Sequence, residues 1–129
     1  MEFKTSFELS GLPIISFYQG DKVYHFLVDT GSNVSYVNVK SDIKIVPTGI
    51  KDVYLGAEGK DMDCEKANIV LYKNGLKYEH IVHVADFNAA FTELKKEYGV
   101  FVTGIIGCDF MDRYNYCLDF KEYTLYTRK

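Results

Sequence analysis

The sequence of 129 residues carries 15 Lys and Arg against 18 Asp and Glu, which gives a formal net charge of -3. A chain of this length forms one domain, and we expect that domain to span residues 1–129. The weak negative charge leaves no basic surface to attract phosphates, so we expect no nucleic-acid partner. The 3 cysteines include no C-x-x-C pair, which favours reduced thiols over a disulfide framework. Because the chain shows no secretory leader pattern and no apolar run of membrane-spanning length, we expect a cytoplasmic protein without membrane contact.

Short segments rich in β-branched and aromatic residues, bounded by turn residues, are typical of strands. In the first two thirds of the chain we expect strands at Phe3–Leu9, Pro13–Tyr18, Val23–Val28, Tyr36–Val39, Lys51–Leu55, Ala67–Tyr72 and Lys77–Val84. The turn at Gly20-Asp21 and the Asn74-Gly75 pair predict two hairpins.

The hydrophobic period changes after residue 85. Four apolar residues then fall on one helical face, and they are Phe87, Phe91, Leu94 and Tyr98. Asp86 suits an N-cap and Gly99 suits a C-terminal stop, so we expect a helix at about 86–98. Strands return at Val100–Ile106, Asn115–Phe120 and Tyr123–Thr127, with one helical turn at Cys108–Arg113. The pattern predicts a mainly β fold, a small closed or partly closed β-barrel with one inserted helix.

The expected strand Val23–Val28 ends on a carboxylate, in the sequence Asp29-Thr30-Gly31-Ser32. An ionised carboxylate at the end of a buried strand is costly unless another group hydrogen-bonds it or shares its charge. The glycine allows another loop to approach closely, because it has no Cβ.

A second segment, Ile105-Ile106-Gly107, follows later in the chain. Together the two segments resemble the retropepsin-like aspartic peptidases, in which a D-T/S-G loop precedes a hydrophobic-hydrophobic-Gly segment. The resemblance extends from about Pro13 to Tyr126. It implies a retropepsin-type barrel, with Asp29, Thr30, Gly31 and Ser32 as catalytic residues and Ile105, Ile106 and Gly107 as supporting residues.

In this family two carboxylates share one proton and activate a water molecule against a peptide bond, without metal or cofactor. The Thr hydroxyl, here Thr30, hydrogen-bonds to the partner loop. Because the chain carries one D-T-G sequence, the resemblance implies a symmetric homodimer in which Asp29 of each subunit completes the site. The partners implied are a second copy of the chain and an extended peptide substrate. We expect the Ser32 hydroxyl to donate to the carboxylates.

The family covers its cleft with a flexible hairpin, and the matching region here is Val53–Glu65. Its tip supplies the candidate substrate-binding flap residues, which are Gly56, Ala57, Glu58 and Gly59. The terminal segments Phe3–Leu9 and Tyr123–Thr127 could interleave between subunits or pair within one chain, and the sequence leaves both arrangements open.

Two other groups of residues have structural interpretations. His80 and His83 are three residues apart on an expected strand, so they point to opposite faces and cannot bind one metal ion together. We expect Cys108 to be a small buried residue.

The sequence supports two hypotheses of different classes. The first is a homodimeric aspartic endopeptidase. The alternative is a catalytically silent retropepsin-like domain that binds a peptide or protein partner. The intact Asp29-Thr30-Gly31 sequence favours the first, because a pure binding module gains nothing from two repelling carboxylates.

Overall fold

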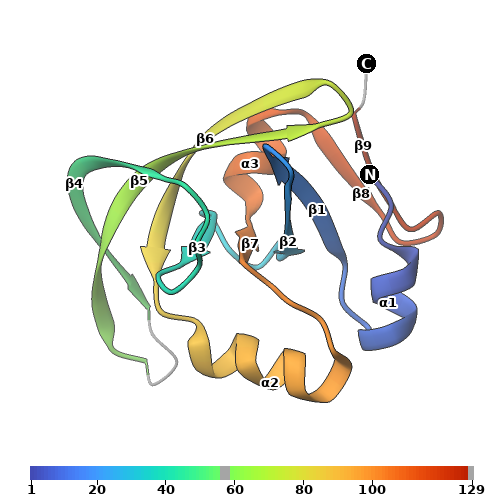
Figure 1. Ribbon diagram of the computed structural model, residues 1–129, viewed down its shortest axis with the longest axis horizontal. Helices are drawn as coiled ribbons and strands as arrows, with labels where there is room; N and C mark the ends of the chain where they lie inside the picture. Colours follow the sequence, from blue (N-terminus) through green and yellow to red (C-terminus); the bar gives the residue numbers. More distant parts are fainter. Residues whose placement is uncertain (56–58, 128–129) are drawn as a thin grey trace.

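The computed structural model describes residues 1–55 and 59–127. Within these residues there are nine strands and three helices (Figure 1). The strands are β1 (Ile14–Gln19), β2 (Lys22–Val28), β3 (Tyr36–Asn38), β4 (Val46–Leu55), β5 (Asp61–Lys73), β6 (Leu76–Ala85), β7 (Gly104–Ile106), β8 (Tyr116–Asp119) and β9 (Thr124–Thr127). The helices are α1 (Lys4–Ser10), α2 (Asn88–Tyr98) and α3 (Cys108–Arg113). None of the helices in these ranges is long and apolar enough to cross a bilayer.

Six strands close into a barrel in the order β1-β2-β7-β3-β6-β5, and β4 continues the sheet beyond β5. The strands β1 and β2 form the expected antiparallel hairpin, and β5 and β6 form the second. A single residue pair, Tyr18 with Tyr72, closes the barrel between β1 and β5. Side chains reinforce this seam: Gln19 Nε2 donates to the carbonyl oxygen of Val70 (3.1 Å), and Lys73 Nζ donates to that of Ser16 (2.7 Å). The prediction of a mainly β fold with a closed barrel is confirmed.

Strand alternation fills the inside of the barrel with large apolar side chains. On β1 and β2 the inward residues include Phe17, Phe26 and Val28, which are almost fully buried. The outward residues Ile14 and Leu27 belong to a second, smaller core, which α2 covers. That core contains the buried residues Ile14, Phe91, Val102 and Ile105.

The inserted helix is confirmed as α2, although it starts two residues later than expected. Phe91 is its buried residue, and Gly99 ends it in the left-handed conformation (φ 70°). The Asp86 carboxylate accepts a hydrogen bond from the backbone of Asn88 (2.9 Å), but Phe87 occupies the N-cap position. The nearly buried side chain of Asn38 holds this end of α2, because its amide donates to Asn88 Oδ1 and its oxygen accepts from the Phe87 N–H (both 2.9 Å).

The prediction of a strand at Phe3–Leu9 is wrong, since residues 4–10 form α1. Phe3 and Phe7 are four residues apart, and their rings pack edge to face on one side of a helical turn, with centroids 6.2 Å apart. Apolar and polar residues also alternate in part of this segment, which is the pattern of a strand, and so the sequence predicted a strand here. The expected strand Val100–Ile106 is also shorter, because only Gly104–Ile106 pairs with neighbours.

The two terminal segments pair within the chain. Phe3 N donates to the carbonyl oxygen of Tyr123 (2.9 Å), and Leu125 N donates to that of Met1 (2.7 Å). The first three residues therefore lie along β9, and α1 sits beside the β8–β9 hairpin in Figure 1. Of the two arrangements left open by the sequence, the structure shows this one.

Candidate functional site

The barrel brings the two sequence motifs together at one sheet edge. Strand β2 ends at Val28 and its parallel neighbour β7 ends at Ile106, and these two residues are register partners. The loop that begins at Asp29 therefore leaves the sheet beside Gly107. A hydrogen bond from the Asp29 N–H to the carbonyl oxygen of Ile106 (2.9 Å) joins the two motifs directly.

Asp29 lies at the start of an exposed loop and is itself half-buried. Its Oδ1 accepts a hydrogen bond from the backbone N–H of Gly31 (2.9 Å), and its carbonyl oxygen accepts one from the N–H of Ser32 (3.2 Å). A Cβ at Gly31 would lie 3.1 Å from Asp29 Oδ1, a tight contact that would push the carboxylate aside by a few tenths of an ångström. Thr30 and Gly31 are exposed, so a second molecule can reach this side of the loop.

Gly107 lets the second motif pack directly against the first. A Cβ at this position would lie 2.8 Å from the carbonyl oxygen of Ser32 and even closer to that of Val34. The close approach permits two backbone hydrogen bonds, from Cys108 N to Ser32 O (2.8 Å) and from Asp109 N to Asn33 O (3.2 Å). The loop after Asp29 is thus fastened to the start of α3.

A polar network beneath this loop was not found from the sequence. The Asp109 carboxylate accepts from the hydroxyl of Ser35 (Oδ1, 2.7 Å), from its N–H (Oδ2, 3.2 Å) and from His80 Nε2 (Oδ2, 2.8 Å). Ser35 is fully buried, and its oxygen also accepts from the N–H of Gly107 (2.9 Å). The sequence does contain a signal for this network: Asp109 lies two positions after Gly107, and Ser35 lies six positions after Asp29.

Hydrogen bonding fixes the ionisation of this network. Burial alone would raise the pKa of Asp109, but the hydrogen bonds from His80 and Ser35 outweigh it and lower the pKa below its usual value. An ionised Asp109 accepts only, so His80 donates through Nε2. Nδ1 of His80 is buried and has no hydrogen-bond partner among the described residues.

His83 lies on the other side of β6 and contacts a different carboxylate. Its Nε2 lies 2.9 Å from Asp52 Oδ2, and Lys66 Nζ approaches the same oxygen at 3.8 Å. The prediction that the two histidines point to opposite faces is confirmed, although both are buried and paired with acidic residues. The described part of the chain contains no group of three or more metal-ligating side chains.

Two expectations about side chains near Asp29 are wrong. The Ser32 hydroxyl donates to the carbonyl oxygen of Val34 (2.7 Å), because the loop turns back on itself there, and so it does not donate to the carboxylate. Cys108 is exposed, because it begins α3 at the surface. Its Sγ donates to the carbonyl oxygen of Thr30 (3.1 Å).

The region of the expected flap is a long hairpin formed by β4 and β5, whose pairing runs to Leu55 and Asp61. Of the four candidate flap residues, Gly56, Ala57 and Glu58 lie outside the described residues, and Gly59 has a left-handed backbone (φ 75°). On β4 the Tyr54 ring packs against two aromatic rings outside the hairpin: its centroid lies 6.0 Å from that of Tyr36 on β3 and 6.3 Å from that of Phe87 at the start of α2.

Comparison of the chain with models of known protein families gives no match, and comparison with curated proteins gives none either. The assignment of a function therefore depends on the geometry of the site.

Proposed function

We propose that this chain is one subunit of a homodimeric aspartic endopeptidase of the retropepsin type. The observation that carries the proposal is the Asp29 carboxylate, which stands on an exposed loop at the end of a barrel strand and is oriented by the Gly31 N–H. The loop is held from below by Gly107 and Asp109. This arrangement presents a carboxylate to a second copy of the same loop.

In the proposed mechanism, Asp29 of one subunit is ionised and takes a proton from a water molecule. Asp29 of the other subunit is protonated and donates a hydrogen bond to the carbonyl oxygen of the scissile peptide bond. The water oxygen attacks the carbonyl carbon, and the proton taken from water passes to the leaving nitrogen as the C–N bond breaks. Two carboxylates that share one site repel each other when both are ionised, so the pair of Asp29 side chains holds one proton. A single subunit supplies half of this pair.

The substrate in this proposal is an extended peptide that lies between the Asp29 loops and the β4–β5 hairpin, and that forms backbone hydrogen bonds with the hairpin. No metal or cofactor takes part. The free cysteines Cys64, Cys108 and Cys117 fit a reducing compartment, so the proposed location is the cytoplasm.

The proposal is tested by sedimentation equilibrium over a range of concentrations and pH, together with cleavage of a peptide library. The wild-type chain is expected to dimerise more strongly at mildly acid pH and to cleave peptides. Asp29→Asn is expected to dimerise at least as well, because it removes the charge repulsion, and to cleave nothing. Asp21→Asn, which changes an exposed turn residue, serves as the matched control. Mixing Asp29→Asn into the wild type should lower activity, because mixed dimers lack one carboxylate.

A catalytically silent domain that binds a peptide or protein is the second candidate, and one observation favours it. Residues 1–3 pair with β9 inside the chain, so they are not free to interleave with a second subunit. The same experiment separates the two functions. A wild type that stays monomeric at high concentration and leaves the library intact would contradict the peptidase. Cleavage by the Asp29→Asn variant would contradict the assigned mechanism.

A further inference from the structure

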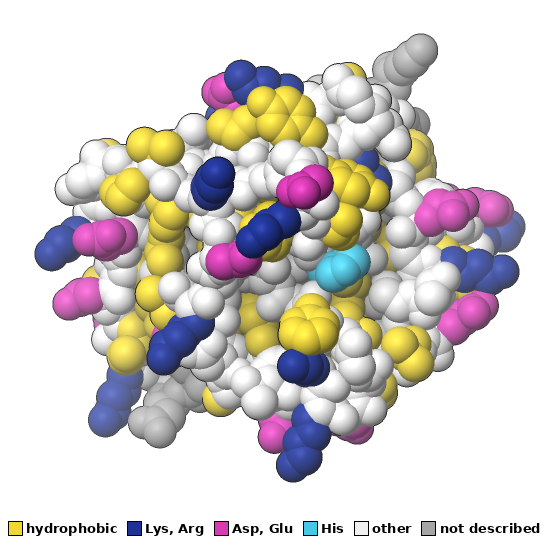
Figure 2. Space-filling view, viewed as in Figure 1, with side chains coloured by type: hydrophobic (Ala, Val, Ile, Leu, Met, Phe, Trp, Pro, Cys, Tyr) yellow, Lys and Arg dark blue, Asp and Glu magenta, His cyan; other side chains and the backbone are white. Residues whose placement is uncertain are grey.

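Beyond the end of β6, the β4–β5 hairpin continues as a two-stranded arm. The β5–β6 register ends at Glu65 and Val84, whereas β4 and β5 stay paired beyond this point. In the described chain the arm comprises residues 52–55 and 61–64. It can move without breaking the pairing of the barrel strands. Figure 2 shows charged side chains of both signs along this edge of the molecule, on the left, so the outer side of the arm faces solvent.

The inner side of the arm contacts the rest of the molecule through two side chains of β4. Asp52 and Tyr54 alternate with the exposed Lys51 and Val53, and so they share the inner face of the strand. The Asp52 carboxylate contacts Nε2 of His83 on β6 (2.9 Å). The Tyr54 ring makes the second contact, which is purely aromatic.

Tyr54 packs against two rings that the core holds in place. Tyr36 and Phe87, which we call the aromatic pair, contact each other edge to face with centroids 5.2 Å apart. Both pack against the second core, and Phe87 stacks on the buried Phe91 (5.4 Å). Tyr54 meets Tyr36 edge to face at 6.0 Å and Phe87 in a tilted arrangement at 6.3 Å. These are the distances and angles that aromatic rings prefer, so the aromatic pair is shaped to take a third ring.

The aromatic pair is near the proposed catalytic carboxylate. Tyr36, Ile105 and Leu27 are register partners on three adjacent strands. Leu27 lies two residues before Asp29. Adjacent strands are about 4.8 Å apart, so Tyr36 lies about 10 Å from β2, which an extended peptide covers in about three residues. Burial raises the pKa of Tyr36, and interaction with the Ser32 hydroxyl, in the loop after Asp29, opposes this rise. The Tyr36 side chain is therefore close to the Asp29 loop as well.

We propose that the aromatic pair receives an aromatic side chain of the substrate peptide, and that Tyr54 occupies this place while no peptide is bound. The peptide lies between the Asp29 loop and the hairpin, as in the proposed function on which this inference rests. A substrate ring within about three residues of the scissile bond makes the same contacts once the arm has moved Tyr54 away. Tyr54 is thus an internal competitor, which lowers the apparent affinity by the fraction of molecules in which the place is free.

The test uses the full chain carrying Asp29→Asn, so that cleavage plays no part. The probes are acetylated and amidated hexapeptides of alternating Thr and Ala that carry one Phe, placed at each position in turn. Binding is followed by amide chemical shifts in NMR spectra. We expect saturable shifts at Tyr36, His83 and Phe87. Binding should be several-fold weaker when cyclohexylalanine, which is similar in size but not aromatic, replaces the Phe.

Three arm variants separate competition by Tyr54 from simple loosening of the arm. Tyr54→Ala removes the competing ring and should bind the Phe peptide about tenfold more tightly, with unchanged binding of the peptide that has no aromatic residue. Asp52→Ala removes the acceptor of His83 and loosens the arm but keeps Tyr54, so it should give no gain that depends on the Phe. Met62→Ala changes the exposed register partner of Tyr54 (47%) and is the matched control.

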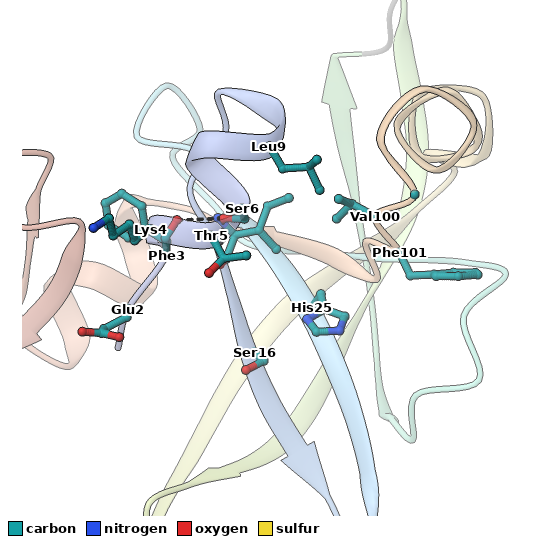
Figure 3. Close-up of a pocket in the computed structure, with 12 residues that line it drawn as sticks. Glu2, Phe3, Lys4, Thr5, Ser6, Leu9, Ser16, His25, Val100 and Phe101 are labelled. Atoms are coloured by element: carbon teal, nitrogen blue, oxygen red, sulfur yellow. Dashed lines mark hydrogen bonds between the residues drawn. The ribbon is translucent and has the colours of Figure 1, made fainter.

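Several outcomes would overturn the proposal. They are an equal gain in Tyr54→Ala for peptides with and without Phe, the same gain in Asp52→Ala, and equal binding of the Phe and cyclohexylalanine peptides. Another is a set of shifts confined to the pocket of about 460 Å³ between α1 and the segment 99–101, which neither ring of the aromatic pair lines (Figure 3).

Cleavage by the wild type tests the proposed function separately. A wild type that cleaves peptides without preferring an aromatic residue near the scissile bond would contradict this inference alone. A wild type that cleaves nothing, although Asp29→Asn binds the Phe peptide at the aromatic pair, would contradict the peptidase alone.

Discussion

Replacing Asp109 should destabilise the loop that carries Asp29 more than any exposed acidic residue would. In Asp109→Ala the Ser35 hydroxyl, the Ser35 N–H and His80 Nε2 lose their acceptor. Ser35 is 0% exposed and His80 is 6% exposed, so water cannot easily take the place of the lost carboxylate as their acceptor. Each buried donor left without a partner costs about 1–3 kcal/mol. Because the hydroxyl can rotate and His80 can change tautomer, we expect a total loss near the lower end, about 3 kcal/mol.

The assay is urea unfolding at several protein concentrations, followed by far-UV circular dichroism and by tyrosine fluorescence, since the chain has 11 Tyr and no Trp. Asp109→Asn keeps one acceptor and should lose about 1–2 kcal/mol. Asp112→Ala, an exposed neighbour on α3, should change stability by less than about 0.5 kcal/mol. Equal losses for Asp109→Ala and Asp112→Ala would refute the assigned network.

The network also sets a pH dependence. The pKa of Asp109 is lowered in the folded chain, so its carboxylate stabilises the fold above the unfolded value of about 3.9 and loses this contribution as pH falls through the folded value. The stability difference between wild type and Asp109→Asn should therefore be constant near neutral pH and narrow below about pH 4. A difference that widens as the pH falls would contradict this sign.

Three further predictions concern single side chains. Gly107→Ala should destabilise the chain by several kcal/mol or prevent folding, because its Cβ meets backbone atoms of the Asp29 loop; wild-type thermal stability would contradict this. A thiol reagent should modify the exposed Cys108 first. Cys64 should react only on unfolding, since it is buried and burial raises the pKa of its thiol. A fast phase of modification that persists in Cys108→Ser would contradict this order. Burial and the 2.5 Å hydrogen bond with Tyr78 raise the pKa of Tyr116. When phenolate absorbance is followed as the pH is raised, Tyr116→Phe should therefore lose the component that titrates at the highest pH. Loss of a component that titrates at lower pH would contradict the raised pKa of Tyr116.

Local patterns in the sequence predicted most of the barrel, because strand alternation and turn residues act over a few positions. The Asn74-Gly75 hairpin and α2 were found in this way. The segment 3–9 was assigned wrongly, because its alternation and its helical spacing coexist, and packing of Phe3 and Phe7 against Tyr123 from the far end of the chain decides between them. Such a contact has no local signal.

The residues of the candidate site likewise fall into those that a local pattern indicates and those that only the fold brings together. Asp29 and Gly107 follow apolar runs and could be recognised where they stand in the sequence. The joint role of Ser35, His80 and Asp109 depends on three separate segments meeting below the loop, which only the folded barrel brings about. The orientation of the Ser32 hydroxyl likewise depends on the turn of its own loop.

The barrel closes along β1 and β5 with one residue pair, and two side chains, Gln19 and Lys73, complete the closure. By contrast, β5 and β6 are paired over nine residues. Partial opening of the molecule should therefore begin at this line, where few bonds need to break, and leave β4, β5 and β6 together as one unit. Residues beside this line, among them Ser16 on β1, would then exchange their amide hydrogens sooner than residues at the centre of the β5–β6 hairpin. The barrel is therefore a sheet whose two edges, β1 and β5, are joined by one residue pair and two side chains, and this junction is its weakest line.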